Sequence, residues 1–252
     1  MATVKIRNIV LGEGLPKIAV PNVGTTEEEI LASAAKIAEA KPDLMEWRID
    51  YYEDGVKNAV ILSETAKKLR DVVGKLPILV TFRTKNEGGV LELTEDAYLD
   101  LVETVIEKRL GDAVDIELFH DEKRIDQLIA SAHNYNVVVI MSNHDFEKVP
   151  AKDVIVFRLK KMASLGADVP KLACMPHNAD DVLTLLEATN EANKALPNPI
   201  ITMAMGDLGK VSRVAGQVFG SSLSFGAVGK VSAPGQLSIE DLRNAESYLE
   251  LH

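Results

Sequence analysis

The chain has 252 residues and a mass of 27.4 kDa, enough to bury one large hydrophobic core, and its 46% hydrophobic and 26% charged residues are typical of a globular protein. Its 28 basic and 38 acidic residues give a net charge of −10, which disfavours nucleic acid and anionic membrane surfaces as partners. Cys174 is the one cysteine, which excludes an intrachain disulfide framework and a cysteine-rich zinc site.

The sequence begins with VKIRNIVLGEG (4–14), which predicts a β-hairpin with GEG as its turn. After it, short β-branched runs alternate with segments of helical periodicity. The eight predicted strands are KIAV (17–20), LMEWRI (44–49), ILVTFR (78–83), AVDIEL (113–118), VVVIMS (137–142), KLACM (171–175), IITMAM (200–205) and LSFGAV (223–228).

The segments between these strands carry the 3.6-residue period of amphipathic helices. Thr26 with Glu29 predicts a capping box at the start of the first helix, and Thr94 precedes the third. The apolar stripe of the third helix is predicted to contain Tyr98, Leu101, Val102, Val105 and Ile106. That of the seventh is predicted to contain Val211, Val214, Ala215, Val218 and Phe219.

Alternating strands and helices predict a parallel sheet covered by helices. Eight repeats in about 250 residues match the (β/α)8 (TIM) barrel, here a single α/β domain over 1–252, with the N-terminal β-hairpin closing the bottom. A doubly wound open sheet is the alternative, but it often has a glycine-rich phosphate turn after the first strand. PNVGTTEEE follows the first strand here and has no such turn.

Charged side chains interrupt the apolar strands mostly near their carboxyl ends, where barrel enzymes build their active sites. They are Glu46, Arg48 and Asp50 on one face of the second strand, Asp115 and Glu117 on one face of the fourth, and Arg83, His144 and Lys171 at the ends of three others. Burying so many charges without a function is costly. We therefore predict that they face one axis and form an active site.

Lys171 begins an apolar strand in GADVPKLACMP, between the small same-face neighbours Val169 and Ala173. Pro170 fits at a strand start, where no ladder donor is needed. A desolvated lysine near other cations loses its charge more readily and can attack a carbonyl as a free amine. The alternative is an ion pair with Asp115 or Glu117 that only stabilises the barrel.

His144, in MSNHDF just past the fifth strand, is the best-placed proton shuttle, because its strand neighbours that of Lys171. The alternative is a loop histidine paired with Asp145 or a backbone carbonyl. The other histidines are placed less favourably, and none has metal-ligand spacing to a second His or Cys. They are His120, His133, His177 and His252.

Three further segments carry candidate binding residues. Glu87 is followed by Gly88 and Gly89, which indicate a mobile loop. Arg213, early in the seventh helix, is placed as a clamp for carboxylate or phosphate, or else as a surface arginine. GKVSAPGQL (229–237) predicts a structured loop or lid, in which Ser232 and Gln236 supply hydrogen-bonding groups.

Type I 3-dehydroquinate dehydratases, the Schiff-base dehydratases of the shikimate pathway, are the family that this sequence closely resembles. The resemblance spans nearly the whole chain in family-like order and spacing, and Arg213 in KVSR agrees with it. The segments that carry it are EWRID (46–50), TFRTKNEGG (81–89), SNHDF (142–146), GADVPKLA (166–173) and SAPGQ (232–236).

The resemblance implies a homodimeric barrel that dehydrates 3-dehydroquinate to 3-dehydroshikimate by syn elimination, without cofactor or metal, in chorismate and aromatic amino acid biosynthesis. It implies that Lys171 forms the imine, that His144 is the general acid and base, and that Glu87 supports His144. The implied substrate contacts are Glu46, Arg48 and Arg83 to hydroxyls and the charge network, Arg213 to the carboxylate, and Ser232 and Gln236 from a closing loop. Some members have a serine at the end of the first strand that touches substrate, where this chain has Pro21, so that contact is in doubt.

Two other functions fit some of the same residues. A class I aldolase would also use Lys171, but usually needs a phosphate site and a carbon–carbon bond to cleave. A second alternative, from a different class, is a non-catalytic carboxylate-binding barrel. No apolar run approaches the ~20 residues that cross a bilayer, and the N-terminus lacks a signal peptide, so a soluble cytoplasmic protein is predicted.

Overall fold

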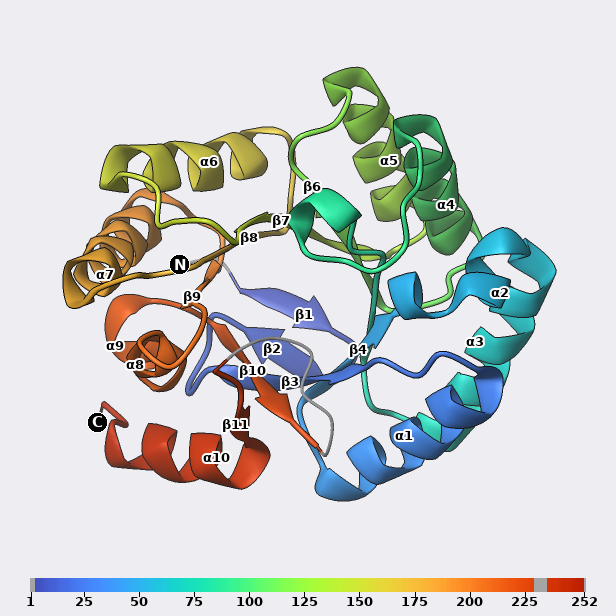
Figure 1. The fold of residues 1–252 in the computed structure, drawn as a ribbon, viewed down its shortest axis with the longest axis horizontal. Coiled ribbons are helices and arrows are strands. Elements are labelled where there is room, and N and C mark those ends of the chain that lie inside the picture. The colour runs from blue at the N-terminus through green and yellow to red at the C-terminus, as the bar shows by residue number, and fades with distance from the viewer. Residues whose placement is uncertain (1–2, 229–234, 252) are drawn as a thin grey trace.

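The computed structural model describes residues 3–228 and 235–251, and shows a barrel of parallel strands ringed by helices (Figure 1). The strands are β1 (Val4–Ile6), β2 (Ile9–Leu11), β3 (Lys17–Asn22), β4 (Leu44–Arg48), β5 (Ile78–Thr81), β6 (Ala113–Glu117), β7 (Val138–Asp145), β8 (Val169–Cys174), β9 (Ile201–Ala204), β10 (Leu223–Ala227) and β11 (Leu237–Ser238). The longer helices are α1 (Glu27–Ala40), α3 (Ala59–Val73), α4 (Glu95–Glu107), α5 (Glu122–Asn134), α6 (Lys152–Ser164), α7 (Ala179–Ala195) and α10 (Ile239–Tyr248). The short ones are η1 (Ile49–Tyr51), α2 (Glu53–Lys57), η2 (Lys85–Glu87), α8 (Lys210–Val214) and α9 (Gly216–Phe219).

All eight predicted strands are present, and they form the barrel as β3 to β10. The nine-stranded sheet has the order β11-β10-β3-β4-β5-β6-β7-β8-β9, with parallel pairing between neighbours. The barrel closes between β9 and β10, where Ile200 bridges Ser221 and the Ser222 N–H donates to the Ile200 carbonyl at 2.8 Å. The predicted barrel is therefore confirmed, and the open-sheet alternative is wrong.

Two strand boundaries differ from the prediction in ways that matter for the site. Strand β8 begins at Val169, two residues before Lys171, and accommodates Pro170 as its second residue. Strand β7 continues to Asp145, because pairing with β8 extends through His144 opposite Ala173. His144 thus lies within a strand and not in a loop, so the barrel itself fixes its backbone.

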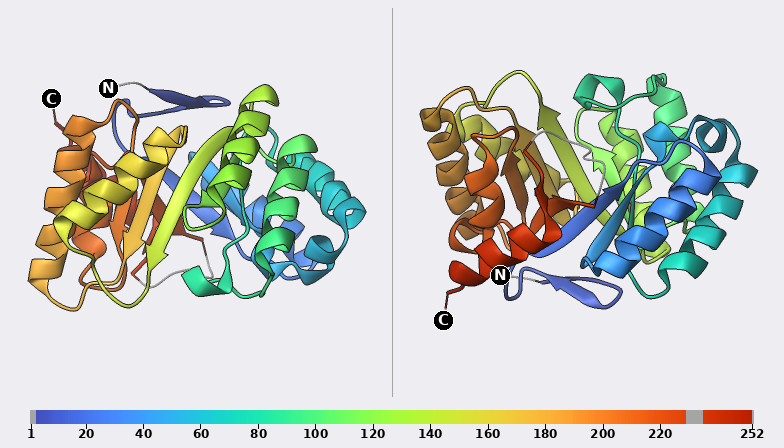
Figure 2. Two further views of the ribbon diagram at one scale, coloured as in Figure 1. Left: turned by 90° about the horizontal axis from the view of Figure 1, so that it is seen from above. Right: turned by 60° about the horizontal axis from the view of Figure 1, so that its bottom comes forward.

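The N-terminal hairpin closes one end of the barrel, as predicted, and Figure 2 shows it at the end away from the strands' carboxyl ends. Ile6, Ile9 and Leu11 of the hairpin are buried there. They pack on a ring of inward side chains, one from each barrel strand: Ala19, Leu44, Leu79, Ala113, Ile140, Val169, Ile201 and Leu223. The floor of the barrel is therefore entirely apolar.

The position of the hairpin turn corrects the prediction. The turn lies at Arg7 and Asn8, between β1 and β2, and GEG follows β2 instead. Arg7 adopts a left-handed backbone with φ of 52°, and its guanidinium donates to Asp112 at 3.1 Å. That ion pair ties the turn to the segment before β6.

The prediction for the third helix is confirmed, whereas the predicted seventh helix is not continuous. The whole predicted stripe of α4 is buried, and Thr26 and Thr94 accept hydrogen bonds from the N–H groups of Glu29 and Ala97 as N-caps. The predicted seventh helix, in contrast, is two short helices, α8 and α9, that break at Ala215.

The face that the seventh segment buries matches the prediction only in part, because Ala215 is buried and Val214 packs against the core. Val211 and Val218 are each 46% exposed, whereas Ser212 and Arg213 are buried. The Ser212 hydroxyl accepts from the Ala204 N–H of β9 at 2.9 Å, so a polar contact orients α8. Gly216 approaches the chain so closely that a Cβ there would lie 2.8 Å from the Ser221 carbonyl oxygen, and the path bends at that point.

A search of the helices in the described ranges 3–228 and 235–251 finds none with the length and apolarity of a membrane span.

A buried carboxyl on α10 makes stability depend on pH. Glu246 is 3% exposed, and burial, then the charge of Asp43, raises its pKa to about 7 against the opposing Arg243 and Lys17. The folded state thus binds this proton more tightly than the unfolded state, whose pKa is near 4.5. The stabilisation that Glu246 provides through this proton is complete below about pH 4.5. It is lost as the pH rises from 4.5 through about 7.

We expect Glu246→Gln to remove this loss, because glutamine keeps the shape without the charge. Relative to the parent chain, its free energy of unfolding in urea should be higher by on the order of 1–3 kcal/mol at about pH 8 and nearly equal at about pH 5. An equal difference at both pH values would show that Glu246 does not titrate in this range.

Candidate active site

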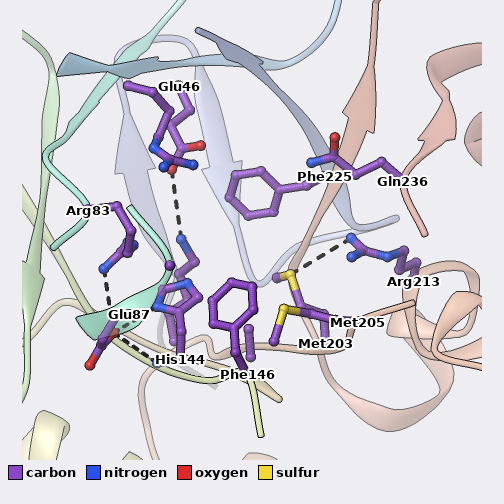
Figure 3. Close-up of a pocket in the computed structure, with 14 residues that line it drawn as sticks. Glu46, Arg83, Glu87, His144, Phe146, Met203, Met205, Arg213, Phe225 and Gln236 are labelled. Atoms are coloured by element: carbon purple, nitrogen blue, oxygen red, sulfur yellow. Dashed lines mark hydrogen bonds and ion pairs between the residues drawn. The ribbon is translucent and has the colours of Figure 1, made fainter. Parts of the chain in front are cut away.

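A cavity opens among the carboxyl ends of the barrel strands, at the end opposite the hairpin, and Figure 3 shows the residues that line it. Its lining contains the described residues that the resemblance implies for catalysis and substrate binding, whereas the predicted Asp50, Asp115 and Glu117 do not line it. The lining residues are Glu46, Arg48, Arg83, Glu87, Gly88, His144, Phe146, Lys171, Ala173, Met203, Met205, Arg213, Phe225 and Gln236. Ser232 lies outside the described residues, so its predicted contact stays a prediction.

The alternation of side chains along the strands explains how these residues meet. Two residues beyond the apolar ring at the floor, each inward position points into the middle of the barrel. Glu46 on β4, Asp115 on β6 and Lys171 on β8 hold such positions, directly above Leu44, Ala113 and Val169. The next inward positions, at the mouth, include Arg48 and His144.

Lys171 is 3% exposed, and its amine has carboxylates on one side and an aromatic ring on another. Its Nζ lies 3.3 Å from Asp115 Oδ2, 3.8 Å from Glu46 Oε1 and 4.7 Å from the centre of the Phe225 ring. The predicted ion pair with Asp115 is therefore present, and the predicted alternative partner Glu117 is bound by Arg83 and Thr84 instead. Lys171 therefore makes this ion pair and also lines the cavity.

Arg83 lies at the centre of the buried charge network. Its guanidinium is 2.8 Å from Asp115, 2.7 Å from Glu117 and 3.6 Å from Glu87. Burial would raise the pKa of Asp115 and Glu117, but the cations and hydrogen bonds around them, Arg83 first, hold both below their usual values. Burial lowers the pKa of Arg83. The charges of the surrounding carboxylates outweigh this effect, so the pKa of Arg83 is raised overall. All three groups are charged at neutral pH.

Asp50 departs from its predicted place. It lies in η1, after the end of β4, and does not line the cavity. Its carboxylate accepts two hydrogen bonds from Arg48 at 2.8 Å, and further ones from the backbone N–H groups of Arg83 and Val90 at 3.3 Å. Asp50 thereby holds Arg48 and both ends of the 83–90 segment in place.

His144 and Glu87 form a pair beside the lysine. The Glu87 Oε2 lies 2.9 Å from His144 Nδ1 and also accepts the His144 backbone N–H at 2.9 Å. Burial, then the charges of Arg83 and Lys171, lowers the pKa of His144 well below its ordinary value. Burial, then the Glu117 carboxylate, raises the pKa of Glu87 to about 7. The imidazole is thus neutral at neutral pH, with Nε2 remaining for the cavity.

The glycines beside Glu87 have a packing role. At Gly89 a Cβ would lie 1.8 Å from the Arg83 carbonyl oxygen, and at Gly88, where φ is 89°, it would meet the Phe146 ring at 2.4 Å. Only glycine lets η2 fold this closely against the end of β5 and place Glu87 on the histidine.

Arg213 lies across the cavity from the His144–Glu87 pair (Figure 3). It is 2% exposed, so the alternative of a surface arginine is wrong. Burial lowers its pKa to about 10, which leaves it charged at neutral pH. Met203 Sδ is 3.9 Å from its Nη1. A cation held in so apolar a wall favours an anionic group of a ligand.

The apolar lining is the part that residue-by-residue reading of the sequence missed. Phe146, Met203, Met205 and Phe225 separate the two charged sides of the cavity in Figure 3. The alternation of side chains along a strand could have predicted two of these residues. Met203 and Phe225 lie two residues beyond Ile201 and Leu223 of the floor, so they point into the barrel as well. Pro21, also past the floor, lines a different hollow beside α1.

The remaining described histidines lie away from the cavity. His120 stacks on Tyr98 with ring centres 4.4 Å apart, His133 on α5 contacts Asp168 at 3.2 Å, and His177 contacts the Glu147 carbonyl oxygen at 2.6 Å. His252 is outside the described residues. Within the ranges 3–228 and 235–251, no group of three His, Cys, Asp or Glu side chains has the arrangement of a metal site.

Comparison with known proteins identifies the family. The model of the type I 3-dehydroquinase family matches residues 18–251. The chain belongs to the type I 3-dehydroquinase family. The resemblance drawn from the sequence motifs is therefore confirmed.

Similar 3-dehydroquinate dehydratases match nearly the whole chain. A 3-dehydroquinate dehydratase of Lactiplantibacillus plantarum is 53% identical and covers 99% of this chain and 98% of its own length. That of Salmonella typhimurium is 46% identical and covers 99% of each. The crystal structure of the Clostridium difficile type I enzyme with covalent modified comenic acid has 44% identity and a TM-score of 0.94, covering 98% and 97% of the two chains.

We expect Arg83→Met to destabilise the protein strongly, because it leaves three buried carboxylates without their shared cation. Losing one member of a buried charge cluster costs roughly 3–5 kcal/mol, measurable as the free energy of unfolding in urea at neutral pH. Arg124→Met is the matched control, because Arg124 pairs with Asp100 at the surface, where such pairs contribute about 0–1 kcal/mol. Equal losses in the two variants would contradict the central role of Arg83.

Proposed function

We propose that this chain is a 3-dehydroquinate dehydratase, which converts 3-dehydroquinate to 3-dehydroshikimate and water by syn elimination through a Schiff base on Lys171. The single observation that supports it most is that a buried lysine amine, a neutral histidine paired with a glutamate, and a buried arginine line one cavity of a type I 3-dehydroquinase. Names of the relatives supply the substrate.

The first step joins Lys171 to the substrate ketone. The amine adds to the carbonyl carbon and water leaves, which gives a protonated imine whose positive nitrogen draws electrons from the α-carbon. Asp115 at 3.3 Å and Glu46 at 3.8 Å from Nζ are placed to stabilise that positive nitrogen. The amine must release a proton before it attacks, and either carboxylate can accept it.

The second step removes the α-proton and then the β-hydroxyl. His144 takes the proton on Nε2, and the electron pair moves into an enamine. The imidazolium, stabilised by the Glu87 carboxylate at 2.9 Å, then donates the proton to the departing hydroxyl, which leaves as water. Hydrolysis of the resulting conjugated imine releases 3-dehydroshikimate and the free lysine.

The proposed substrate contacts come from both sides of the cavity. Arg213 binds the carboxylate on the side opposite the histidine, which orients the ring so that one imidazole reaches both the α-proton and the hydroxyl. Glu46, Arg48 and Arg83 contact the hydroxyls, and Ser232 and Gln236 contribute from the closing loop. The mechanism requires neither cofactor nor metal.

Absorbance tests the function directly. Incubation with 3-dehydroquinate should produce the absorbance of a conjugated enoate, whereas an aldol cleavage or simple binding of the substrate produces no such chromophore. No absorbance change with the folded protein would refute the proposed activity.

Lys171→Ala should abolish turnover, because no other group can form the imine. Borohydride added with substrate should trap a covalent adduct on the peptide that contains Lys171, detected by mass spectrometry. Lys152→Ala is the control, since Lys152 pairs with Glu191 at the surface, and it should retain both turnover and the adduct. Turnover by Lys171→Ala, or an adduct on another lysine, would refute the role of Lys171.

For His144→Ala we expect a fall in kcat of about 10²–10⁴-fold with little change in substrate affinity, because the imidazole transfers protons and does not hold the carboxylate. Steady-state kinetics separates the two effects. A change confined to KM would exclude His144 as the proton shuttle.

We also propose that the chain is one catalytic domain, forms a homodimer, works in the cytoplasm and serves chorismate biosynthesis. Phe157 on α6 and Leu183 on the adjacent α7, 65% and 58% exposed, support the dimer as surface that a second copy can cover. Sedimentation equilibrium of the parent chain tests the oligomeric state.

A further inference from the structure

A chain of hydrogen bonds extends from the His144–Glu87 pair, away from the cavity, to helix α6. The Asn143 Nδ2 donates to Glu87 Oε1 at 2.9 Å, and Arg158 Nη1 donates to Asn143 Oδ1 at 2.8 Å. Asn143 is 4% exposed and Arg158 is half-buried, and neither lines the cavity. The chemistry proposed above assigns no role to either residue.

Arg158 determines which way the Asn143 amide points. A carboxamide can present either its oxygen or its NH2 group to a neighbour, but a guanidinium only donates hydrogen bonds. The Asn143 oxygen must therefore face Arg158, and the NH2 group must face Glu87. The opposite orientation would place the amide oxygen against the Glu87 carboxylate and the NH2 group against a cation.

The orientation of the amide matters because Glu87 is balanced between its two protonation states. Burial and the Glu117 and Asp115 carboxylates raise its pKa to about 7, and Arg83 and the Asn143 amide oppose them. A donor on Oε1 favours the ionised form. Because the pKa lies at neutral pH, the loss of this hydrogen bond would reduce the fraction of Glu87 that is charged there.

The protonation of Glu87 in turn sets the tautomer of His144. An ionised Glu87 accepts a hydrogen bond from the His144 Nδ1–H at 2.9 Å, so Nε2 faces the cavity without a proton and can act as a base. A protonated Glu87 would donate to Nδ1 and leave the proton on Nε2, where the imidazole is no longer a base. Figure 3 shows the His144 imidazole beside the Glu87 carboxyl.

We propose that Asn143 and Arg158 are positioning residues that keep Glu87 ionised and thereby keep His144 in the tautomer that can take the substrate proton. The proposal rests on the proposed function for the role of His144 as base. It adds two residues to the acid–base machinery, one of them on an outer helix.

The charged groups around Glu87 come from several elements. Arg83 follows β5, Asp115 and Glu117 belong to β6, His144 to β7, and His120 lies 3.6 Å from Glu117. Behind the pair is a hollow of about 290 Å³, whose lining adds Asp145 and Arg158. Of these groups, Arg158 is the one whose hydrogen bond reaches Glu87 through Asn143, so its removal isolates the proposed link.

The test is the pH dependence of kcat in four variants. We expect kcat of the parent chain to fall as pH drops through about 7, because Glu87 becomes protonated. Asn143→Ala should move this acid limb up by about one pH unit, the effect of losing a hydrogen bond to a charged group. Arg158→Met should move it in the same direction, and Asn143→Ala/Arg158→Met should match Asn143→Ala alone. Arg158→Lys, which keeps a cationic donor, should restore the limb toward the parent position.

The control is Lys160→Met, which removes an equal charge from an exposed position of the same helix and should leave the limb unchanged. An unmoved limb in Asn143→Ala, or one moved only as far as in Lys160→Met, would overturn the proposal. So would additive shifts in the double variant, because Arg158 would then act independently of Asn143. A lower melting temperature with an unchanged limb would mean that the two residues only stabilise the fold.

A second measurement does not depend on turnover. Nitrogen-15 NMR of the imidazole, with the His144 signal assigned by its absence in His144→Ala, reports the tautomer without substrate. The parent chain should carry the proton on Nδ1 at about pH 7.5, and Asn143→Ala should shift the population toward Nε2. If that shift occurs in a protein that does not dehydrate 3-dehydroquinate, the proposed function is wrong and the positioning role stands. If the tautomer is unchanged, the positioning role is wrong whatever the activity.

Discussion

One guanidinium makes the charged interior of this barrel possible. Arg83 contacts the carboxylates of Asp115, Glu117 and Glu87, each of which is buried. Without that cation, burial would favour the protonated forms of these carboxyls. The position of Lys171 depends on the same arrangement, because its nearest partner, Asp115, is held charged in part by Arg83.

The barrel accommodates these charges by separating them from its floor. Along β4, β5, β6 and β7 the first inward residue is apolar and packs on the hairpin or its neighbours, and polar residues come two and four positions later. The series run Leu44, Glu46, Arg48 on β4, Leu79, Thr81, Arg83 from β5, Ala113, Asp115, Glu117 on β6, and Ile140, Ser142, His144 on β7. The apolar floor provides hydrophobic stabilisation, and the rigid strands above it fix the charged groups at hydrogen-bonding distances.

This regular series explains how much the sequence predicts. The eight strands and their inward charges follow from a period of two residues, so the charged cavity residues on the strands could be named in advance. The break between α8 and α9 could not, because it depends on a close approach of Gly216 to Ser221. Nor could Asn143 or Arg158, whose contact joins a strand to a helix that begins after it and follows no periodicity.

The contacts that control the acid–base chemistry are also ones that strand periodicity does not predict. Strand periodicity places His144 beside Lys171, but it does not decide where the imidazole proton lies. That depends on the charge of Glu87, whose pKa of about 7 is the sum of unfavourable burial, two neighbouring carboxylates, one arginine and one amide. Because that pKa lies close to neutral pH, a contact on the outer side of the barrel is enough to change the charge of the carboxyl. The residues that set proton transfer therefore extend beyond those that line the cavity, as far as helix α6.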